Sequence, residues 1–206
     1  MKGLKIKYQN FHFENLLEVI KKKKKILVTG GSNIDFFLKK IFKNKSILNS
    51  KKCFFISDER VSSNELDTNY FKIEQLFKKK KKRIKFYRII SLPKNLITET
   101  NRYSSVVRNG MDVAFLSLGE KYHIASLFYN YPAIYSSQFT SITYSYDFKF
   151  LRISVNKRLL SKIKRIYLFI NGKKRLKEFR TMIDKKLLDF YFNKKQQKKI
   201  IVIYKK

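Results

Sequence analysis

His123 is the residue in this sequence best suited to chemistry. Histidine is the natural general base near neutral pH, because its ordinary pKa is close to physiological pH. His123 comes just after the apolar run Val113–Ser117 and Gly119, so it lies past the end of a predicted strand. An isolated histidine in a loop is more often incidental, and that alternative stays open. The only other histidine is His12, near the N-terminus.

The sequence predicts no metal site, and a single cysteine allows no intrachain disulfide. Cys53 is that cysteine, and no Cys/His/Asp constellation surrounds either histidine. A carboxylate of Asp58, Glu59 or Glu120 within hydrogen-bond reach of His123 would orient the imidazole for proton transfer. Its absence would leave the activity less secure.

A second polar segment follows the apolar run Cys53–Ser57 and consists of Asp58, Glu59 and Arg60. A guanidinium in such a place can stabilise negative charge that develops during a reaction. The alternative is a set of surface salt bridges at the end of a strand. Thr68-Asn69-Tyr70 follows shortly afterwards and is placed to cap a helix.

A third segment, Thr29-Gly30-Gly31-Ser32-Asn33, forms a glycine turn between a predicted strand and a predicted helix. Two glycines let the backbone approach a ligand closely, and Ser32 offers a hydroxyl. Amides at a helix N-terminus suit a phosphate group. A plain tight turn is an equally good interpretation of this segment alone.

Strand-like apolar runs alternate with helical periodicity along the chain. The sequence predicts strands over residues 26–29, 53–57, 84–89, 113–117, 152–155, 166–170 and 200–204. It predicts helices over 34–42, 68–77 and about 174–192, and a short helix from His123. The stretch 135–146 is either a loop or a pair of edge strands.

This alternation predicts an α/β fold with a mainly parallel sheet and helices on both faces. No repeat or linker divides the chain, so residues 1–206 are expected to form one domain. Ligands of open α/β sheets bind outside the carboxyl ends of the strands. The three polar segments all follow predicted strands, so they are expected to meet at one edge of the sheet.

The formal net charge of +33 has two possible explanations. A nucleic-acid partner would select for Lys and Arg, which neutralise phosphates. Here Lys, Ile, Asn, Phe and Tyr are abundant together while Ala, Gly and Pro are scarce, which is the skew that A/T-rich codons produce. We favour the genomic explanation, with a reduced, A/T-rich genome such as an endosymbiont's, and expect no specific nucleic-acid partner.

Other bulk features favour a cytoplasmic protein. No apolar stretch is long enough for a membrane span, and the N-terminus lacks the apolar core of a secretory signal. We therefore expect no membrane partner. A monomer is the simplest expectation for the assembly.

Taken together, the segments resemble the 6-phosphogluconolactonase family, part of the superfamily that includes the glucosamine-6-phosphate isomerases (deaminases). Family members typically show SGGSTP, DER followed by SNY, LGMGxDGHTASLFP, R-[IL]-[ST], and an apolar strand ending in TG with a lysine beyond it. The matching text, in the same order over roughly residues 26–185, is Thr29–Ser32, Asp58–Arg60 with Thr68–Tyr70, Leu116–Phe128, Leu151–Ser154, and Ile166–Gly172 followed by Lys174 and Arg175. Deaminases resemble DEY and GHIAFNEP at two of these places, so Arg60 and Ala125–Phe128 look like the lactonase side.

The resemblance implies a Rossmann-like open sheet and a metal-independent carboxylic-ester hydrolase without a cofactor. The substrate would be 6-phospho-gluconolactone, a sugar phosphate, and the product 6-phosphogluconate. His123 would deprotonate the attacking water, and Arg60 would bind substrate or stabilise the anionic intermediate. The resemblance assigns substrate or phosphate binding to Gly30, Gly31, Ser32, Asp58, Glu59, Asn69, Arg152, Lys174 and Arg175.

Some residues depart from the family pattern. Lys121-Tyr122 replaces the Asp-Gly before the histidine, and Ile124 replaces the Thr after it. A nearby Lys121 would lower the pKa of His123. Asn33-Ile34 stands in place of the family's Thr-Pro. The alternative to an enzyme is therefore a descendant that binds sugar phosphates but whose catalysis is weakened or lost.

Overall fold

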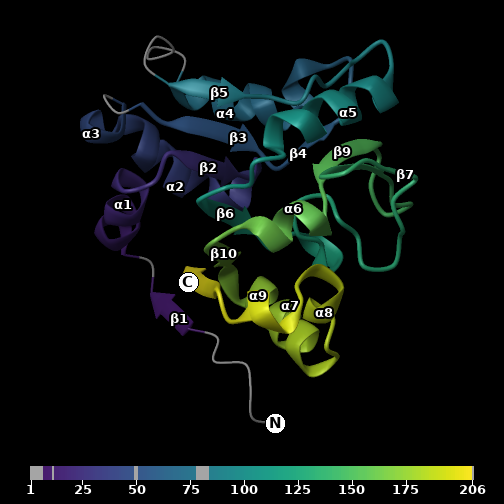
Figure 1. Ribbon diagram of the computed structural model, residues 1–206. Helices are drawn as coiled ribbons and strands as arrows, with labels where there is room; N and C mark the ends of the chain where they lie inside the picture. Colours follow the sequence, from purple (N-terminus) through teal and green to yellow (C-terminus); the bar gives the residue numbers. More distant parts are fainter. Residues whose placement is uncertain (1–6, 11, 49–50, 78–83, 206) are drawn as a thin grey trace.

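The computed structural model describes residues 7–10, 12–48, 51–77 and 84–205 (Figure 1). Its largest element is a seven-stranded, entirely parallel sheet in the order β1-β11-β10-β6-β2-β3-β5. The strands are β1 (Lys7–Asn10), β2 (Lys25–Val28), β3 (Cys53–Ile56), β5 (Lys85–Tyr87), β6 (Val113–Ser117), β10 (Ile166–Asn171) and β11 (Ile200–Lys205). The predicted α/β class and mainly parallel sheet are confirmed.

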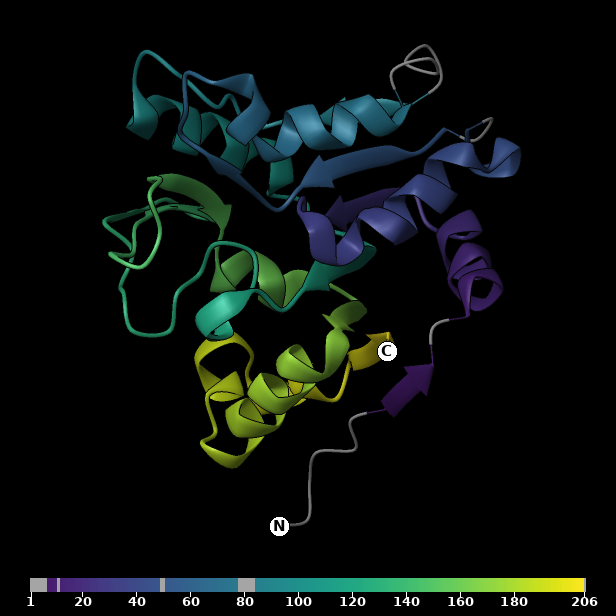
Figure 2. The ribbon, with the colours of Figure 1, turned by 180° about the vertical axis from the view of Figure 1, so that it is seen from behind.

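A second, antiparallel sheet of four short strands lies beside the parallel one (Figure 2). Its order is β4-β9-β8-β7, with β4 (Asp58–Arg60), β7 (Tyr135–Ser136), β8 (Thr140–Thr143) and β9 (Arg152–Val155). The ambiguous stretch 135–146 thus contributes two strands, of which β7 is the edge. The predicted strand at 152–155 is present, but it belongs to this small sheet.

Ser57 joins the two sheets. Its amide donates to the Val28 carbonyl in the parallel sheet, and its carbonyl accepts from the amide of Val155 in β9. The chain therefore passes from β3 into β4 through one buried residue. This connection carries Asp58 and Arg60 directly from the carboxyl end of a parallel strand into the small sheet.

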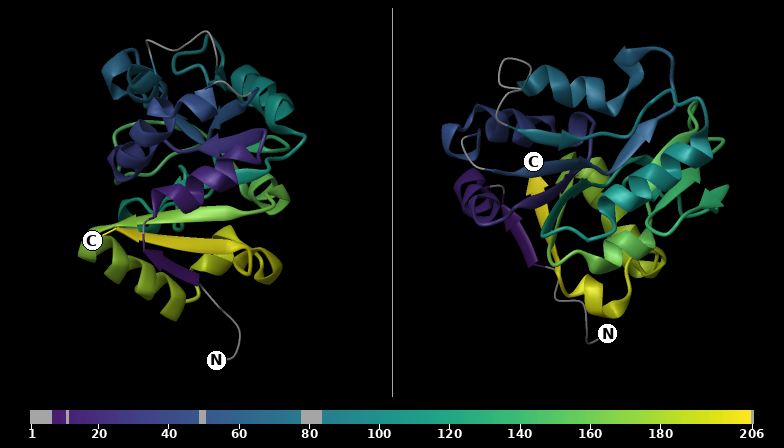
Figure 3. Two further views of the ribbon diagram at one scale, coloured as in Figure 1. Left: turned by 90° about the vertical axis from the view of Figure 1, so that its left-hand side faces the viewer. Right: turned by 45° about the horizontal axis from the view of Figure 1, so that its top comes forward.

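Helices cover both faces of the parallel sheet (Figures 1 and 3). They are α1 (Phe13–Lys21), α2 (Ser32–Lys43), α3 (Lys45–Leu48), α4 (Asn69–Phe77), α5 (Leu96–Val107), α6 (Lys157–Lys162), α7 (Gly172–Asp184), α8 (Leu188–Tyr191) and α9 (Lys194–Gln197). The crossovers through α2 and α4 run from β2 towards β5, whereas the crossover through α5 returns from β5 to β6. Right-handed crossovers therefore place α5 on the face opposite α2 and α4.

The core forms where the apolar periodicity predicts it. Ile34, Phe37, Leu38, Ile41 and Phe42, the apolar stripe of α2, are all completely buried. Their i, i+3, i+4 spacing puts them on one side of the helix, facing the sheet. This packing fixes α2, and with it the glycine turn that precedes the helix.

Two predicted helices differ from the structure. No helix starts at His123: a 3₁₀ turn, Glu120–Tyr122, precedes it, and Lys121 and Tyr122 both have left-handed φ values of 51° and 66°. After it, Ile124 forms isolated bridges with Leu118 and Leu127 instead of helical bonds.

The predicted charged helix over 174–192 is two helices. The first, α7, ends at Asp184, and α8 begins only at Leu188. Between them Lys186 takes a left-handed φ of 57°, which a continuous helix cannot contain.

Candidate active site

A cavity of about 430 Å³ opens at the carboxyl ends of β2 and β6. The connection after β2 leads towards β3, whereas the chain after β6 leads towards β10, so the strand order reverses between them. Open α/β sheets bind their ligands at such a switch point. The cavity lining includes eight of the predicted site residues: Gly30, Gly31, Asp58, Arg60, Asn69, His123, Arg152 and Arg175.

The His123 ring has a defined hydrogen-bond partner on one side only. Its Nδ1 lies 2.6 Å from the main-chain carbonyl oxygen of Glu120, which can only accept a hydrogen bond. Nδ1 therefore carries the proton, and Nε2 is the unprotonated nitrogen. No carboxylate oxygen of the described residues is hydrogen-bonded to the ring, so a backbone carbonyl orients it.

The ring of His123 is enclosed by aromatic side chains and by Gly119. Its centroid lies 5.3 Å from that of Phe128 and 5.1 Å from that of Phe148. A Cβ built on Gly119 would lie 2.0 Å from His123 Nε2. Glycine is thus required at position 119 for the close approach of the ring.

These surroundings lower the pKa of His123 to about 4. Burial of the ring is the largest cause and the Arg152 guanidinium is the second, while the Glu120 carbonyl and Asp58 act in the opposite direction. Lys121 is not among the largest causes of this shift, and its ammonium forms an ion pair with Asp147. His123 is accordingly neutral at physiological pH and able to accept a proton.

Asp58 is buried at the centre of a polar network. Its carboxylate accepts hydrogen bonds from Thr29 Oγ1 (3.2 Å), Ser57 Oγ (2.6 Å), Asn69 Nδ2 (3.2 Å) and Ser126 Oγ (2.6 Å). These four donors satisfy the oxygens of a buried carboxylate. Asp58 therefore ties the glycine turn, β3, α4 and the segment after His123 together.

Ser126 extends this network to Arg152. Arg152 Nη1 donates to Ser126 Oγ at 3.2 Å, and Ser126 Oγ donates in turn to Asp58. In the sequence, Ser126 is recognisable only as part of the family motif. Its bridging role depends on β9 lying beside the segment after β6, which no local pattern encodes.

Arg60 and Arg152 face each other as register partners across β4 and β9. The Nε atoms of both side chains are buried and have no hydrogen-bond partner. Like charges directly opposite each other in a sheet are destabilising. The Phe150 ring lies 5.9 Å from the Arg60 guanidinium and the Phe148 ring lies 5.2 Å from that of Arg152, a cation–π arrangement that offsets part of the repulsion. Such a pair has spare hydrogen-bond donors for an anion.

Glu59 lies behind the cavity wall and is not among the residues that line it. Its carboxylate accepts the backbone amides of Asn69 (2.6 Å), Tyr70 (2.7 Å) and Arg60 (2.8 Å). Burial nevertheless raises the pKa of Glu59 to about 7. Glu59 thus caps the start of α4. This helix holds Asn69 close to Gly30: a Cβ added at Gly30 would lie 2.6 Å from Asn69 Cβ.

The remaining predicted residues differ in placement. Arg175 lines the cavity and is paired with Glu120 (2.6 Å) and Glu178 (2.5 Å), whereas the adjacent Lys174 is exposed and outside the lining. Ser32 begins α2, and its side chain lies outside the described part of the structure.

Nine residues of the cavity lining were not among the predicted site residues: Thr29, Asn33, Asp35, Lys72, Ser117, Gly119, Glu120, Ala125 and Phe148. Asp35 and Lys72 could have been found from helical spacing, since Lys72 comes three residues after Asn69 and Asp35 comes four after Gly31. Phe148 comes from an irregular segment that has no periodic signal.

Two further cavities have volumes of about 510 and 630 Å³. The first lies behind Phe128 and the second beneath the amino ends of the strands, and neither lining contains a histidine. No cluster of three or more His, Cys, Asp or Glu side chains suited to a metal ion occurs among the described residues. Within the same residues, no helix has both the length and the apolar character needed to cross a membrane.

Comparisons with known proteins agree with this architecture. The model of the family described as glucosamine-6-phosphate isomerases/6-phosphogluconolactonase matches residues 7–189, and the chain belongs to this family. No curated protein matches the sequence.

Solved structures share the fold at low sequence identity. A 6-phosphogluconolactonase from Shewanella baltica is 17% identical with a TM-score of 0.82, and the alignment covers 98% of this chain and 99% of that one. One from Thermotoga maritima is 20% identical with a TM-score of 0.75, again covering 98% and 99%. One from Plasmodium vivax is 20% identical with a TM-score of 0.74, covering 94% and 85%.

Proposed function

We propose that the protein hydrolyses 6-phospho-gluconolactone to 6-phosphogluconate, a step of the oxidative pentose phosphate pathway. The observation that carries the proposal is a neutral His123, with Nε2 unprotonated, in one cavity with the facing arginines Arg60 and Arg152. A base and two guanidinium groups are what hydrolysis of an anionic ester requires. Membership of the family and the titles of its solved structures support this choice of reaction.

In the proposed reaction, His123 Nε2 takes a proton from water and the hydroxide adds to the lactone carbonyl carbon. Arg60 stabilises the resulting oxyanion. The carbonyl re-forms as the bond to the ring oxygen breaks, and that oxygen takes the proton back from His123. Every step uses side chains of this chain alone, without metal or cofactor.

The substrate itself is expected to improve the base. Arg152 is the second cause of the low pKa of His123, and a phosphate held by Arg152 would offset that positive charge. The amides of Gly31 and the start of α2, which has no side-chain cap, would complete the phosphate site. Binding would therefore raise the pKa of His123 towards neutral pH.

The test is hydrolysis of freshly prepared 6-phosphogluconolactone against the spontaneous rate in buffer. We expect clear acceleration by the wild-type protein and none by His123→Ala. His12→Ala, which changes the other histidine, is the matched control and is expected to retain full activity. No acceleration at micromolar protein would refute the proposal.

One observation favours the second candidate, a sugar-phosphate-binding protein with weakened catalysis. His123 is oriented by a carbonyl and not by a carboxylate, and Lys121-Tyr122 occupies the place of the family's Asp-Gly. Such a protein would bind 6-phosphogluconate in calorimetry without accelerating hydrolysis. In either case we expect a cytoplasmic monomer that has no specific nucleic-acid or membrane partner.

A further inference from the structure

Lys72 is a cation of the cavity that the family motifs do not include. It lies in the first turn of α4, three residues after Asn69, and both side chains line the cavity. Residues at this spacing share one face of a helix. Because Asn69 lies against Gly30, this face of α4 points at the glycine turn and the start of α2.

Lys72 differs from the other cations of the cavity in having no hydrogen-bond or ion-pair partner among the described residues. Arg175 is paired with two glutamates, Arg152 donates to Ser126, and Arg60 Nη1 donates to the Asp67 carbonyl at 2.7 Å. Among the described residues, none accepts a hydrogen bond from Lys72 Nζ or forms an ion pair with it. Burial and the nearby Arg60 lower the pKa of Lys72, whereas the charges of Asp67, Asp35 and Glu59 act in the opposite direction.

Asp35, in the first turn of α2, is close enough to Lys72 for the two charges to interact. Burial raises the pKa of Asp35, whereas the charges of Lys39 and Lys72 act to lower it. Both lysines are therefore near the start of α2, but only Lys72 lines the cavity, and Lys39 is exposed. Lys72 and three residues at the start of α2, Gly31, Asn33 and Asp35, thus line the same cavity.

We propose that Lys72 is a substrate-binding residue that holds the phosphoryl group of the ligand together with the start of α2. This inference rests on the proposed function, because it concerns how the same cavity selects a phosphorylated sugar. An ammonium on a flexible stem can follow the dianion as a point charge. Lys72 then gains the partner that it lacks in the unliganded protein, and the cavity favours phosphorylated over unphosphorylated ligands.

Calorimetric titration with 6-phosphogluconate and with gluconate, at constant ionic strength, tests this inference without needing turnover. Lys72→Met should weaken 6-phosphogluconate binding by about tenfold or more, as expected for a lost charged hydrogen bond, and leave gluconate binding unchanged. Lys72→Arg should retain most of the affinity. Lys39→Met removes an equal charge near Asp35 from outside the cavity and should change binding less than about twofold.

Equal effects of Lys72→Met and Lys39→Met would overturn the inference, as would equal weakening of both ligands by Lys72→Met. Failure of the wild-type protein to bind 6-phosphogluconate would overturn it too. Thermal unfolding of each variant verifies that the fold is retained. The lactonase proposal fails separately, through absent hydrolysis in a protein that still discriminates the two ligands.

Discussion

Gly119 leaves the space that the His123 ring occupies. Its φ of −85° is open to any residue, so Gly119→Ala should fold, but the added Cβ would lie 2.0 Å from Nε2 and must displace the ring. A shift of about 1 Å in a catalytic group can cost roughly 100-fold in rate. We expect kcat/KM for the lactone to fall by about that factor. Retention of more than about a tenth of the activity, with Tm unchanged, would contradict this geometry.

The low pKa of His123 predicts an unusual pH dependence. Because the ring stays neutral until the pH approaches about 4, kcat/KM should hold steady from neutral pH down to about 5 and decline below that. Arg152→Met removes a cause of the low pKa and should move the midpoint upward. Imidazole NMR titration in a His12→Gln background measures it directly, and a wild-type midpoint near 6.5 would contradict the prediction.

The same residue links pH to stability. The unfolded chain binds a proton on this histidine near pH 6.5, whereas the folded protein does so only near 4. The unfolded state therefore holds more protons between these values, and the contribution of His123 makes the folded protein less stable as the pH falls through this window.

Sequence patterns could identify much of the site at the scale of residues. His123, Asp58 and Arg60 follow strands, and the carboxyl ends of parallel strands meet at one edge. By sequence, Glu59 and Asp58 are adjacent carboxylates that could both bind a ligand. Only the structure shows that Glu59 instead accepts hydrogen bonds from the amides at the start of α4. Lys72 depends on how α4 packs against the glycine turn, which the sequence alone does not specify.

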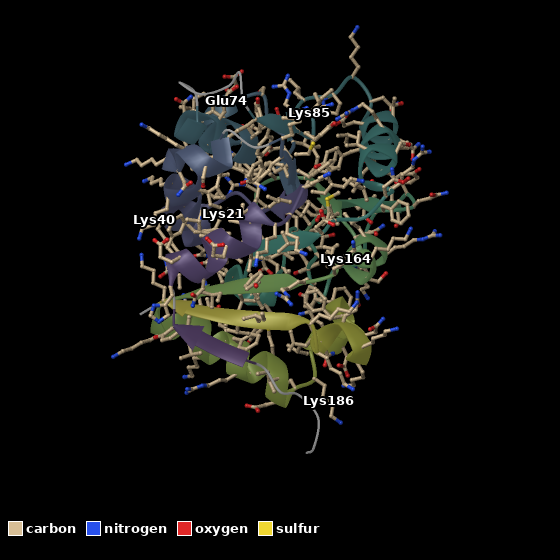
Figure 4. The ribbon with its side chains drawn as sticks, turned by 60° about the vertical axis from the view of Figure 1, so that its left-hand side comes forward. Lys21, Lys40, Glu74, Lys85, Lys164 and Lys186 are labelled. Atoms are coloured by element: carbon tan, nitrogen blue, oxygen red, sulfur yellow. The ribbon has the colours of Figure 1, made fainter. Side chains whose placement is uncertain are left out.

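At the scale of elements, the junction of α7 and α8 carries avoidable strain. Lys186 is exposed with a left-handed φ of 57°, which costs roughly 1 kcal/mol or more for a residue with a Cβ (Figure 4). Lys186→Gly should therefore raise the free energy of unfolding by about 1 kcal/mol in urea titrations. The adjacent Lys185 has a φ of −85°, so Lys185→Gly should give no gain. Stabilisation by both variants would point to charge as the cause, instead of backbone conformation.

Some helices lie where the sequence predicted none. The helix α1 is one of them although Leu16, Leu17 and Ile20 form a buried apolar stripe, whereas α5 lacks such a stripe. The buried face of α5 consists of Glu99, Thr100, Tyr103, Ser104 and Val107. Because most of these residues are polar, the sequence shows no apolar stripe here. Hydrogen bonds make that burial possible: Tyr103 donates to the Ile56 carbonyl, and the amide of Phe139 donates to Ser104 Oγ. The helix α2 was predictable because its apolar side chains recur at helical spacing and are buried.

At the scale of the whole molecule, the net charge of +33 should act on every anionic ligand (Figure 4). Long-range attraction increases association with anions and is screened as the Debye length shortens. We expect kcat/KM to fall as salt rises from about 20 to about 200 mM, where the Debye length drops below roughly 10 Å. A matched series with uncharged gluconolactone should show little change. Equal salt dependence for both substrates would contradict electrostatic attraction.

Duplex DNA provides the complementary measurement. Binding that reflects charge alone should be equal for unrelated sequences and disappear in moderate salt. Sequence-selective binding that survives such salt would instead identify a nucleic-acid partner.

Because Arg60 and Arg152 lie opposite each other across β4 and β9, the stability of the fold should depend on whether an anionic ligand is bound. An anion between these guanidinium groups removes a repulsion that the empty protein must tolerate. Ligand at about 100 times its Kd stabilises any native state by about 2.7 kcal/mol, a large share of the stability of an ordinary domain. In a cell the resident sugar-phosphate pool would then act as a chemical chaperone, and the half-life of the protein would follow metabolic supply.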